Sequence, residues 1–412
     1  MVEDSLCRWF FPIALSIGHI NNKVYRLKNN IWFAYLSVFF LWQPVVLEAQ
    51  TSDVQKKKKT EMYIFSRSEV YGYSDAFPAR SYLNLLVGPA PKNGDFAFAR
   101  TRVELGLGFN NFEISAIHRN DYNLTFSPDV ADFTYRRKNR VRVQPGDDFV
   151  VDVRANQYQV SGAKLAYKMP LHDTFTLNLA YSHLVSTEIV SGRMGRTPEG
   201  EGGLVSISIE ELPDGRRFER LQGLVYTDYY YTDDPFFERA VDEPAGRGFA
   251  IDVGFEWQVN DKLLVVGQVD DLAGELRWNN IGRTTATATS TTREFNEEGF
   301  TDILPNFEGN ETFADFTQSL TRRESLSFTY DWRTNWQFGY DYISYPEIAL
   351  HNFSVAYEWR PNWSVALAIE PQTSGKSLGL NTPIGDMYFI FDTLDFDQAR
   401  TLGFGWSFAF LL

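Results

Sequence analysis

The sequence predicts an all-β fold, a transmembrane antiparallel β-barrel of about 12 strands (roughly 10–14), on three observations. Polar and apolar residues alternate with a period of two over many segments, aromatic residues make up 16% of the chain, and the last segment alternates up to Leu412. A soluble domain has few places for 34 Phe, 21 Tyr and 10 Trp. A barrel has many, because its lipid-facing surface and both interfacial belts accept aromatic rings.

Residues 1–49 are predicted to be an export signal peptide. An apolar stretch at 31–47 follows three basic residues, and Ala49 supplies a small residue at the cleavage site. A charged start, an apolar core and a small residue at the cut are typical of a secretory signal. A single membrane anchor is the alternative.

After cleavage, residues 50–80 are expected to form a periplasmic N-terminal segment or plug. Residues 81–412 are expected to form the barrel in the outer membrane of a Gram-negative bacterium. We place the first outward strand somewhere in 62–87, around Tyr82 to Val87.

The alternation is clearest in residues 249–257, and similar patterns recur in 174–182, 325–332, 336–342 and 353–369. In the first of these, apolar Phe249, Ile251, Val253, Phe255 and Trp257 alternate with Ala250, Asp252, Gly254 and Glu256. A membrane barrel needs this pattern because one face of each strand meets lipid and the other meets the lumen. A soluble sandwich alternates too, but its inner faces are richer in Val and Leu.

Short polar turns and long connections alternate along the chain. The short turns are typical of hairpins and of the periplasmic side of a barrel. Long connections are expected outside, at 122–156, 185–247, 279–322 and 372–400. Tryptophans flank the later short turns and are predicted to form an aromatic girdle at one membrane interface: Trp257, Trp332, Trp336, Trp359 and Trp363.

The C-terminal strand at 401–412 resembles the signal by which the barrel-assembly machinery recognises outer-membrane proteins. Its apolar residues occupy every second position up to the end of the chain. The usual final residue is Phe, and here it is Leu412. The resemblance implies that this machinery and outer-membrane lipids are partners.

Charged residues on the other face of the strands should line the lumen. The predicted solute pathway consists of Arg100, Arg102, Glu104, Lys164, Asp252, Glu256, Arg277, Asp331, Asp341 and Glu358, with Glu370 beside them. They form either a charged pathway that sets solute preference or a salt-bridged interior that only holds the barrel round. The bore is either plugged or open. A mild acidic excess favours cations or neutral polar solutes.

One basic cluster lies in the connection at 122–156. It consists of Arg136, Arg137, Lys138, Arg140 and Arg142. Arginine suits binding to lipopolysaccharide phosphates, and equally a constriction folded into the bore. The alternative is an exposed loop segment balanced by Asp147, Asp148 and Asp152.

Other functions are disfavoured by composition. A net charge of −14 and a pI of about 4.9 argue against nucleic acid as a partner. The only cysteine, Cys7, precedes the predicted cleavage site, and the histidines lack metal-ligand spacing. No cofactor, metal or enzyme activity is expected. A lipid hydrolase using His183 with Ser182 or Ser186 on the lipid face is the enzymatic alternative.

Residues 248–278 resemble a hairpin found in barrels of the FadL-type hydrophobic-solute transporters. The shared features are a Gly-led strand, an Asn-Asp-Lys turn and an Asp-Leu-Ala-Gly end to the second strand. The resemblance implies transport, and an N-terminal plug that residues 50–97 could supply. The plug's aromatics would then be Tyr63, Phe65, Tyr71, Tyr73 and Phe77.

The favoured function is therefore passive passage or uptake of small solutes through the barrel. The first alternative is a non-conducting structural or assembly barrel that binds a partner through its loops. The second is a lipid-modifying enzyme.

Overall fold

The computed structural model describes residues 62–83, 86–141, 143–144, 146–211, 217–233, 245–289, 294–295, 301–302 and 306–412. The signal peptide expected at 1–49 lies outside these residues.

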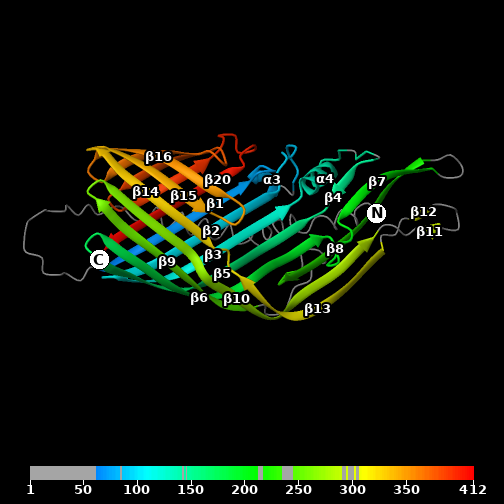
Figure 1. The fold of residues 1–412 in the computed structure, drawn as a ribbon, viewed down its shortest axis with the longest axis horizontal. Coiled ribbons are helices and arrows are strands. Elements are labelled where there is room, and N and C mark those ends of the chain that lie inside the picture. The colour runs from blue at the N-terminus through cyan, green and yellow to red at the C-terminus, as the bar shows by residue number, and fades with distance from the viewer. Residues whose placement is uncertain are drawn as a thin grey trace, which may run out of the picture.

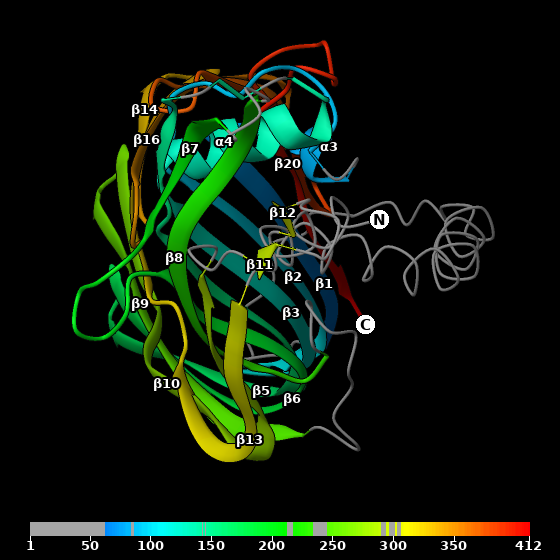
Figure 2. The ribbon, with the colours of Figure 1, turned by 90° about the vertical axis from the view of Figure 1, so that its right-hand side faces the viewer.

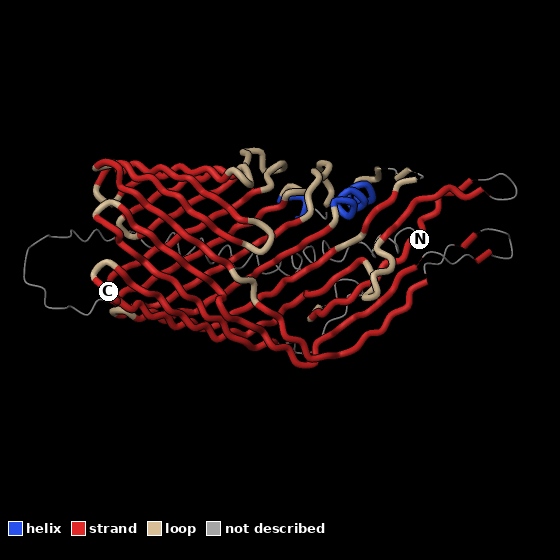
Figure 3. The backbone as a smooth tube through the Cα atoms, viewed as in Figure 1, coloured by secondary structure: helices blue, strands red, loops and turns tan. Residues whose placement is uncertain are grey.

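Fourteen antiparallel strands close into a barrel (Figures 1 and 3). In chain order they are β1 (Met62–Ser74), β2 (Phe96–Phe109), β3 (Phe112–Phe126), β5 (Val153–His172), β6 (Phe175–Gly195), β9 (Gly246–Asn260), β10 (Leu263–Thr289), β14 (Arg323–Arg333), β15 (Trp336–Ser344), β16 (Ala349–Arg360), β17 (Trp363–Glu370), β18 (Gly375–Thr382), β19 (Gly385–Phe391) and β20 (Thr401–Leu411). Strand β20 closes the ring on β1, from Tyr63 opposite Leu411 to Tyr73 opposite Thr401.

The closed antiparallel barrel is as expected, but the count of about 12 strands was wrong. The two missing strands are β18 and β19, which occupy much of the connection expected at 372–400. They have 8 and 7 residues and meet at a tight turn of Pro383 and Ile384. Strands this short offer too few alternating positions to stand out in a sequence.

The barrel wall begins at Met62, so the expectation that residues up to 80 precede it was wrong. Strand β1 pairs with β2 along its whole length as well as with β20. Its aromatic residues alternate with Ser66, Ser68 and Gly72, and the register turns the aromatics inward, next to inward positions of β2. In most strands of the wall the aromatic side chains face outward. In β1 they face the lumen, so a prediction that places aromatic residues on the outer face is wrong for this strand.

All the two-residue turns lie at the end of the barrel that holds the C-terminus, which we call the short-turn end. The five tryptophans of the predicted girdle flank turns at this end and are between 37% and 46% exposed. The Trp359 and Trp363 ring centroids are 6.3 Å apart across one such turn. Their contact with a membrane interface stays a prediction.

At the opposite end one side of the wall rises far beyond the other (Figures 1 and 2). Strands β5, β6 and β10 have 20, 21 and 27 residues. Strand β8 (Arg217–Tyr231) pairs with β6 and β10 above the end of β9, and β13 (Asn306–Ser319) pairs with β10 above β14. The long loops expected at 185–247 and 279–322 are therefore largely strand in their described parts.

The remaining elements are small. They are β4 (Asp148–Val150), β7 (Leu204–Glu211), β11 (Glu294–Phe295), β12 (Thr301–Asp302) and the helices α3 (Ala79–Leu83) and α4 (Pro128–Lys138). Both helices lie at the tall end of the barrel (Figure 1), where Phe133 of α4 packs on Phe149. Within the described residues, no helix combines the length and apolarity needed to cross a membrane.

Candidate functional site: a side-chain septum in the lumen

A bulge in β10 places two carboxylates inside the barrel. The pairing with β9 is interrupted between Val269 and Ala273, and Asp271 adopts a positive φ of 55°. The Asp271 amide donates to Asp252 Oδ1 at 3.0 Å. The Asp271 carboxylate accepts both Nη1 and Nη2 of Arg119, at 2.8 and 2.7 Å. Arg119 is only 1% exposed, so this bidentate pair is sealed from water.

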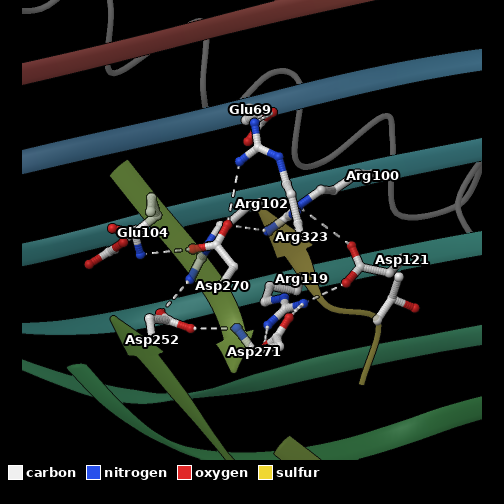
Figure 4. A network of polar contacts seen from close by, with 12 residues as sticks. Glu69, Arg100, Arg102, Glu104, Arg119, Asp121, Asp252, Asp270, Asp271 and Arg323 are labelled. Carbon is white, nitrogen blue, oxygen red and sulfur yellow. Dashed lines mark hydrogen bonds and ion pairs between the residues drawn. The ribbon is translucent and has the colours of Figure 1, made fainter. Parts of the chain in front are cut away.

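A continuous set of ion pairs extends from this point across the lumen (Figure 4). Arg100 Nη2 lies 3.1 Å from Asp270 Oδ2, although their strands β2 and β10 are far apart around the ring. Arg323 of β14 reaches Asp270 and Glu69, each at 3.4 Å. Strands from several sides of the lumen therefore meet through these side chains.

The ion-pair set is balanced in charge. Its seven basic members are Arg67, Arg100, Arg102, Arg119, Lys164, Lys168 and Arg323, and its seven acidic members are Glu69, Glu104, Glu113, Asp121, Asp252, Asp270 and Asp271. We call these fourteen residues the ionic half. Most are buried, and a buried charge is tolerated only when it is paired and hydrogen-bonded. The formal charge of −14 does not arise here.

An aromatic cluster lies in the lumen beside the ionic half. The Phe98 and Tyr345 ring centroids are 4.6 Å apart, and those of Tyr71 and Phe98 are 5.6 Å apart. Tyr71 Oη donates to Glu370 Oε1 at 2.5 Å, which joins β1 to β17. Leu350, 1% exposed, packs in the same cluster. We call Tyr71, Phe98, Tyr345, Leu350 and Glu370 the aromatic half.

The two halves form one septum, because the Arg323 guanidinium lies 5.7 Å from the Tyr345 ring centroid. Arg100 with Asp270 joins two strands that are not neighbours in the wall, and Phe98 of β2 meets Tyr345, which directly follows β15. The septum is therefore made of wall side chains that reach across the barrel.

Below the septum, toward the short-turn end, the lumen has an acidic wall, which we call the vestibule. The register turns Asp331, Asp341, Glu358 and Asp386 inward. Two of them accept hydrogen bonds from neutral amide side chains: Gln337 Nε2 donates to Asp331 at 2.9 Å and Asn352 Nδ2 donates to Asp341 at 3.2 Å. On β15–β20, all of whose residues are described, no basic side chain faces inward.

The predicted lumen residues divide among these regions. Five lie in the ionic half: Arg100, Arg102, Glu104, Lys164 and Asp252. Glu370 belongs to the aromatic half. Glu256, Asp331, Asp341 and Glu358 face the vestibule. Their role in a solute pathway stays a prediction.

Arg277 was placed wrongly in the lumen. Its side chain is 72% exposed and pairs with Glu275 on the outer face. The inward neighbours Leu276 and Trp278 are 0% and 1% exposed and join an apolar cluster inside the tall wall. At this height, above the apolar part of the outer face, the polar residues of β10 face outward and the apolar ones face inward. The rule that polar residues line the lumen therefore gives the wrong side here.

Sequence reasoning missed nine members of the ionic half: Arg67, Glu69, Glu113, Lys168, Arg119, Asp121, Asp270, Asp271 and Arg323. On β3 the period-two signal was present for Glu113, between Phe112 and Ile114, but the polar residues His118 and Asn120 beside Arg119 and Asp121 obscure it there. The Asp270–Asp271 pair gave no such signal, because a bulge breaks the alternation that would reveal it.

The predicted basic cluster lies at the tall end, with Arg136, Arg137 and Lys138 in the last turn of α4. Arg136 donates to Asp132 at 2.9 Å and to Asp147 at 3.3 Å, and the first of these hydrogen bonds raises the pKa of its guanidinium. Figure 2 shows α4 at the rim of the barrel. Arg140 follows the helix, and Arg142 lies outside the described residues. Binding to lipopolysaccharide phosphates stays a prediction.

The structure does not assemble the hydrolase pair considered from the sequence. Ser182 and Ser186 are 2% and 0% exposed and face inward, whereas His183 is on the outer face. His118 Nδ1 and Ser161 Oγ are 2.9 Å apart on that outer face. The amides around them belong to strand pairing, so none is free to stabilise an oxyanion. Among the described residues, no group of three His, Cys, Asp or Glu could hold a metal.

Comparisons with known proteins give one family and several solved structures. Residues 212–392 match a family described as "Family of unknown function (DUF5723)". No curated protein matches. The structure is similar to FadL-type barrels, with 85–86% of this chain covered.

Three of these structures are the TodX deltaS2S3 mutant monoaromatic hydrocarbon channel (7% identity, 90% of that chain, TM-score 0.40), the P. putida toluene transporter TodX (8%, 88%, 0.39) and a Pseudomonas aeruginosa FadL homologue (10%, 88%, 0.35).

Proposed function

We propose that the barrel spans the bacterial outer membrane and lets small neutral or cationic solutes pass through its lumen, with the septum as the closed constriction. The observation that carries this proposal is the acidic vestibule, whose wall on β15–β20 turns no basic side chain inward. A structural interior would pair these carboxylates, as the ionic half does.

The outer face supports the membrane location. On β9 the outward side chains from Phe249 to Trp257 are all apolar, over nine residues, and Arg247 follows above them. A strand crosses a bilayer in about 9–11 residues. On β20 the outward residues from Leu402 to Phe410 are apolar too, including Phe404 and Phe408.

Passage requires the septum to open, and the aromatic half is the part suited to this. Tyr71 and Phe98 can leave the centre by side-chain rotation, because they stand on wall strands rather than on a separate folded segment. The ionic half would have to separate buried charges, which is far more costly. Solutes would therefore pass on the aromatic side, above the acidic wall of β15–β19.

Planar-bilayer recording tests this proposal. The double variant Phe98→Ala with Tyr345→Ala should show a several-fold larger single-channel conductance than the wild type, with potassium preferred over chloride. The matched control, Phe338→Ala with Phe389→Ala, removes two outer-face rings that are 44% and 48% exposed. It should leave conductance unchanged.

If neither the wild type nor the double variant conducts, and neither lets small neutral solutes swell liposomes, solute passage is wrong. The second candidate, a structural or assembly barrel that binds a partner, would then stand. It is favoured by the sheet of β7, β8, β10 and β13 that rises above the wall, on which Leu204 and Phe313 are 45% and 60% exposed.

A further inference from the structure

The loop at residues 392–400, between β19 and β20, presents two apolar side chains to the outside. Leu394 is 78% exposed and Phe396 is 65% exposed. Removing such groups from water is favourable, so a defined loop conformation that exposes both calls for an explanation.

The conformation of loop 392–400 is well defined by hydrogen bonds. The Asp392 carboxylate accepts the amides of Arg400 at 3.2 Å and Thr401 at 3.4 Å. The Asp395 carboxylate accepts the Asp397 amide at 3.0 Å. These contacts hold the loop so that its carboxylates bind its own backbone while the apolar side chains point away.

Two contacts attach the loop to the rim. Arg80 of α3 pairs with Asp397, and Arg400 Nη1 donates to the Asp75 carbonyl oxygen at 3.4 Å. Asp392 and Asp397 are thus engaged within the protein. The acidic residues of the loop do not prevent its apolar tip from meeting an apolar or anionic surface.

The loop continues the apolar outer face of the wall. It begins directly after Phe391 and ends directly before β20, whose Leu402 and Phe404 are outward residues, as Phe391 is. In Figures 1 and 2 this segment, drawn in red, projects beyond the outline of the barrel and away from its axis. Lys376, exposed on the outer face of β18, is paired in register with Phe391.

The wall is shortest beside this loop. Strands β17, β18 and β19 have 8, 8 and 7 residues, fewer than the roughly 9–11 that a crossing strand normally needs. A short apolar surface leaves part of the lipid layer without an apolar neighbour unless the bilayer thins or flanking residues compensate. Leu394 and Phe396 are placed to extend that surface upward.

We infer that loop 392–400 is an interfacial anchor: Leu394 and Phe396 enter the outer leaflet at the boundary of headgroups and acyl chains, and Lys376 lies near a lipid phosphate. This inference rests on the membrane location in the proposed function, but not on solute passage. Because the anchor acts on the short side of the wall, it also fixes how deep the barrel sits there.

Spin-label depth measurement in phospholipid vesicles tests the anchor. Variants in a Cys7→Ser background carry one nitroxide-labelled cysteine at Leu394, at Ile369 or at Phe313. Ile369 is a lipid-facing wall residue that is 56% exposed, and Phe313 lies on β13, far above the wall. The accessibility of each label to oxygen, which concentrates in lipid, is compared with its accessibility to a water-soluble nickel complex.

The label at Leu394 should be more accessible to oxygen than to nickel, at a depth between the other two labels. If it is as accessible to nickel as the Phe313 label, the anchor is wrong. If it is immobilised and reached by neither reagent, a protein contact covers the loop and the anchor is also wrong. If the Ile369 label is open to nickel, the membrane location itself fails. Conductance is recorded separately, so a non-conducting barrel with a buried Leu394 label contradicts only solute passage.

Discussion

The ionic and aromatic halves of the septum join opposite sides of the lumen by different physical means. In the ionic half each charged group depends on several others, so the removal of one leaves a buried charge without a partner. In the aromatic half, rings such as Phe98 and Tyr345 pack without charge, and one hydrogen bond from Tyr71 to Glu370 crosses the lumen. Breaking a contact in the ionic half should therefore cost more stability than breaking one in the aromatic half, which is the half that we propose opens.

The largest effect is expected from breaking the ionic half. Arg119→Met leaves Asp271 and Asp121 buried without their guanidinium, which should lower the free energy of unfolding by about 3–5 kcal/mol. Urea unfolding in lipid vesicles measures the loss.

Arg277→Met on the exposed outer face is the control for Arg119→Met, and it should change stability by no more than about 0.5 kcal/mol. Equal effects of the two substitutions would show that the ionic half is not a brace.

A smaller effect is expected in the aromatic half. Tyr71→Phe keeps the ring but removes the hydrogen bond to Glu370, and hydrogen bonds to charged groups contribute about 1.5–3 kcal/mol. The free energy of unfolding should fall by that amount, and channel opening should become more frequent in bilayer recordings. If stability falls as expected but the opening frequency does not change, the hydrogen bond between Tyr71 and Glu370 stabilises the barrel without controlling its opening.

The smallest effect on stability is expected in the vestibule, where the effect on selectivity should be clear. Asp341→Asn removes one half-buried inward carboxylate and should change stability by less than about 0.5 kcal/mol. The zero-current potential in a potassium chloride gradient should move toward equal permeability of the two ions, because an inward charge sets ion preference.

Glu324→Gln on the outer face of β14 removes the same charge as Asp341→Asn and should leave the zero-current potential unchanged. A shift of equal size in both variants would mean that surface charge, rather than the vestibule, sets the selectivity.

Local features of the sequence predicted most of the wall. Most of the strands and their short turns were predicted because alternation and turn residues are local signals. The failures have local causes as well. Strands β18 and β19 are very short, β1 turns its aromatic side inward, and Arg277 lies above the apolar band.

The sequence by itself determined that most strands have one lipid-suited face and one polar face, because side chains point to opposite sides of a strand wherever that strand lies. Only the tertiary structure decided which inward residues meet. Arg100 and Asp270 are 170 residues apart, and Tyr71 and Glu370 are 299 apart. These contacts depend on the number of strands, their stagger and the β10 bulge, which together set the distances across the lumen.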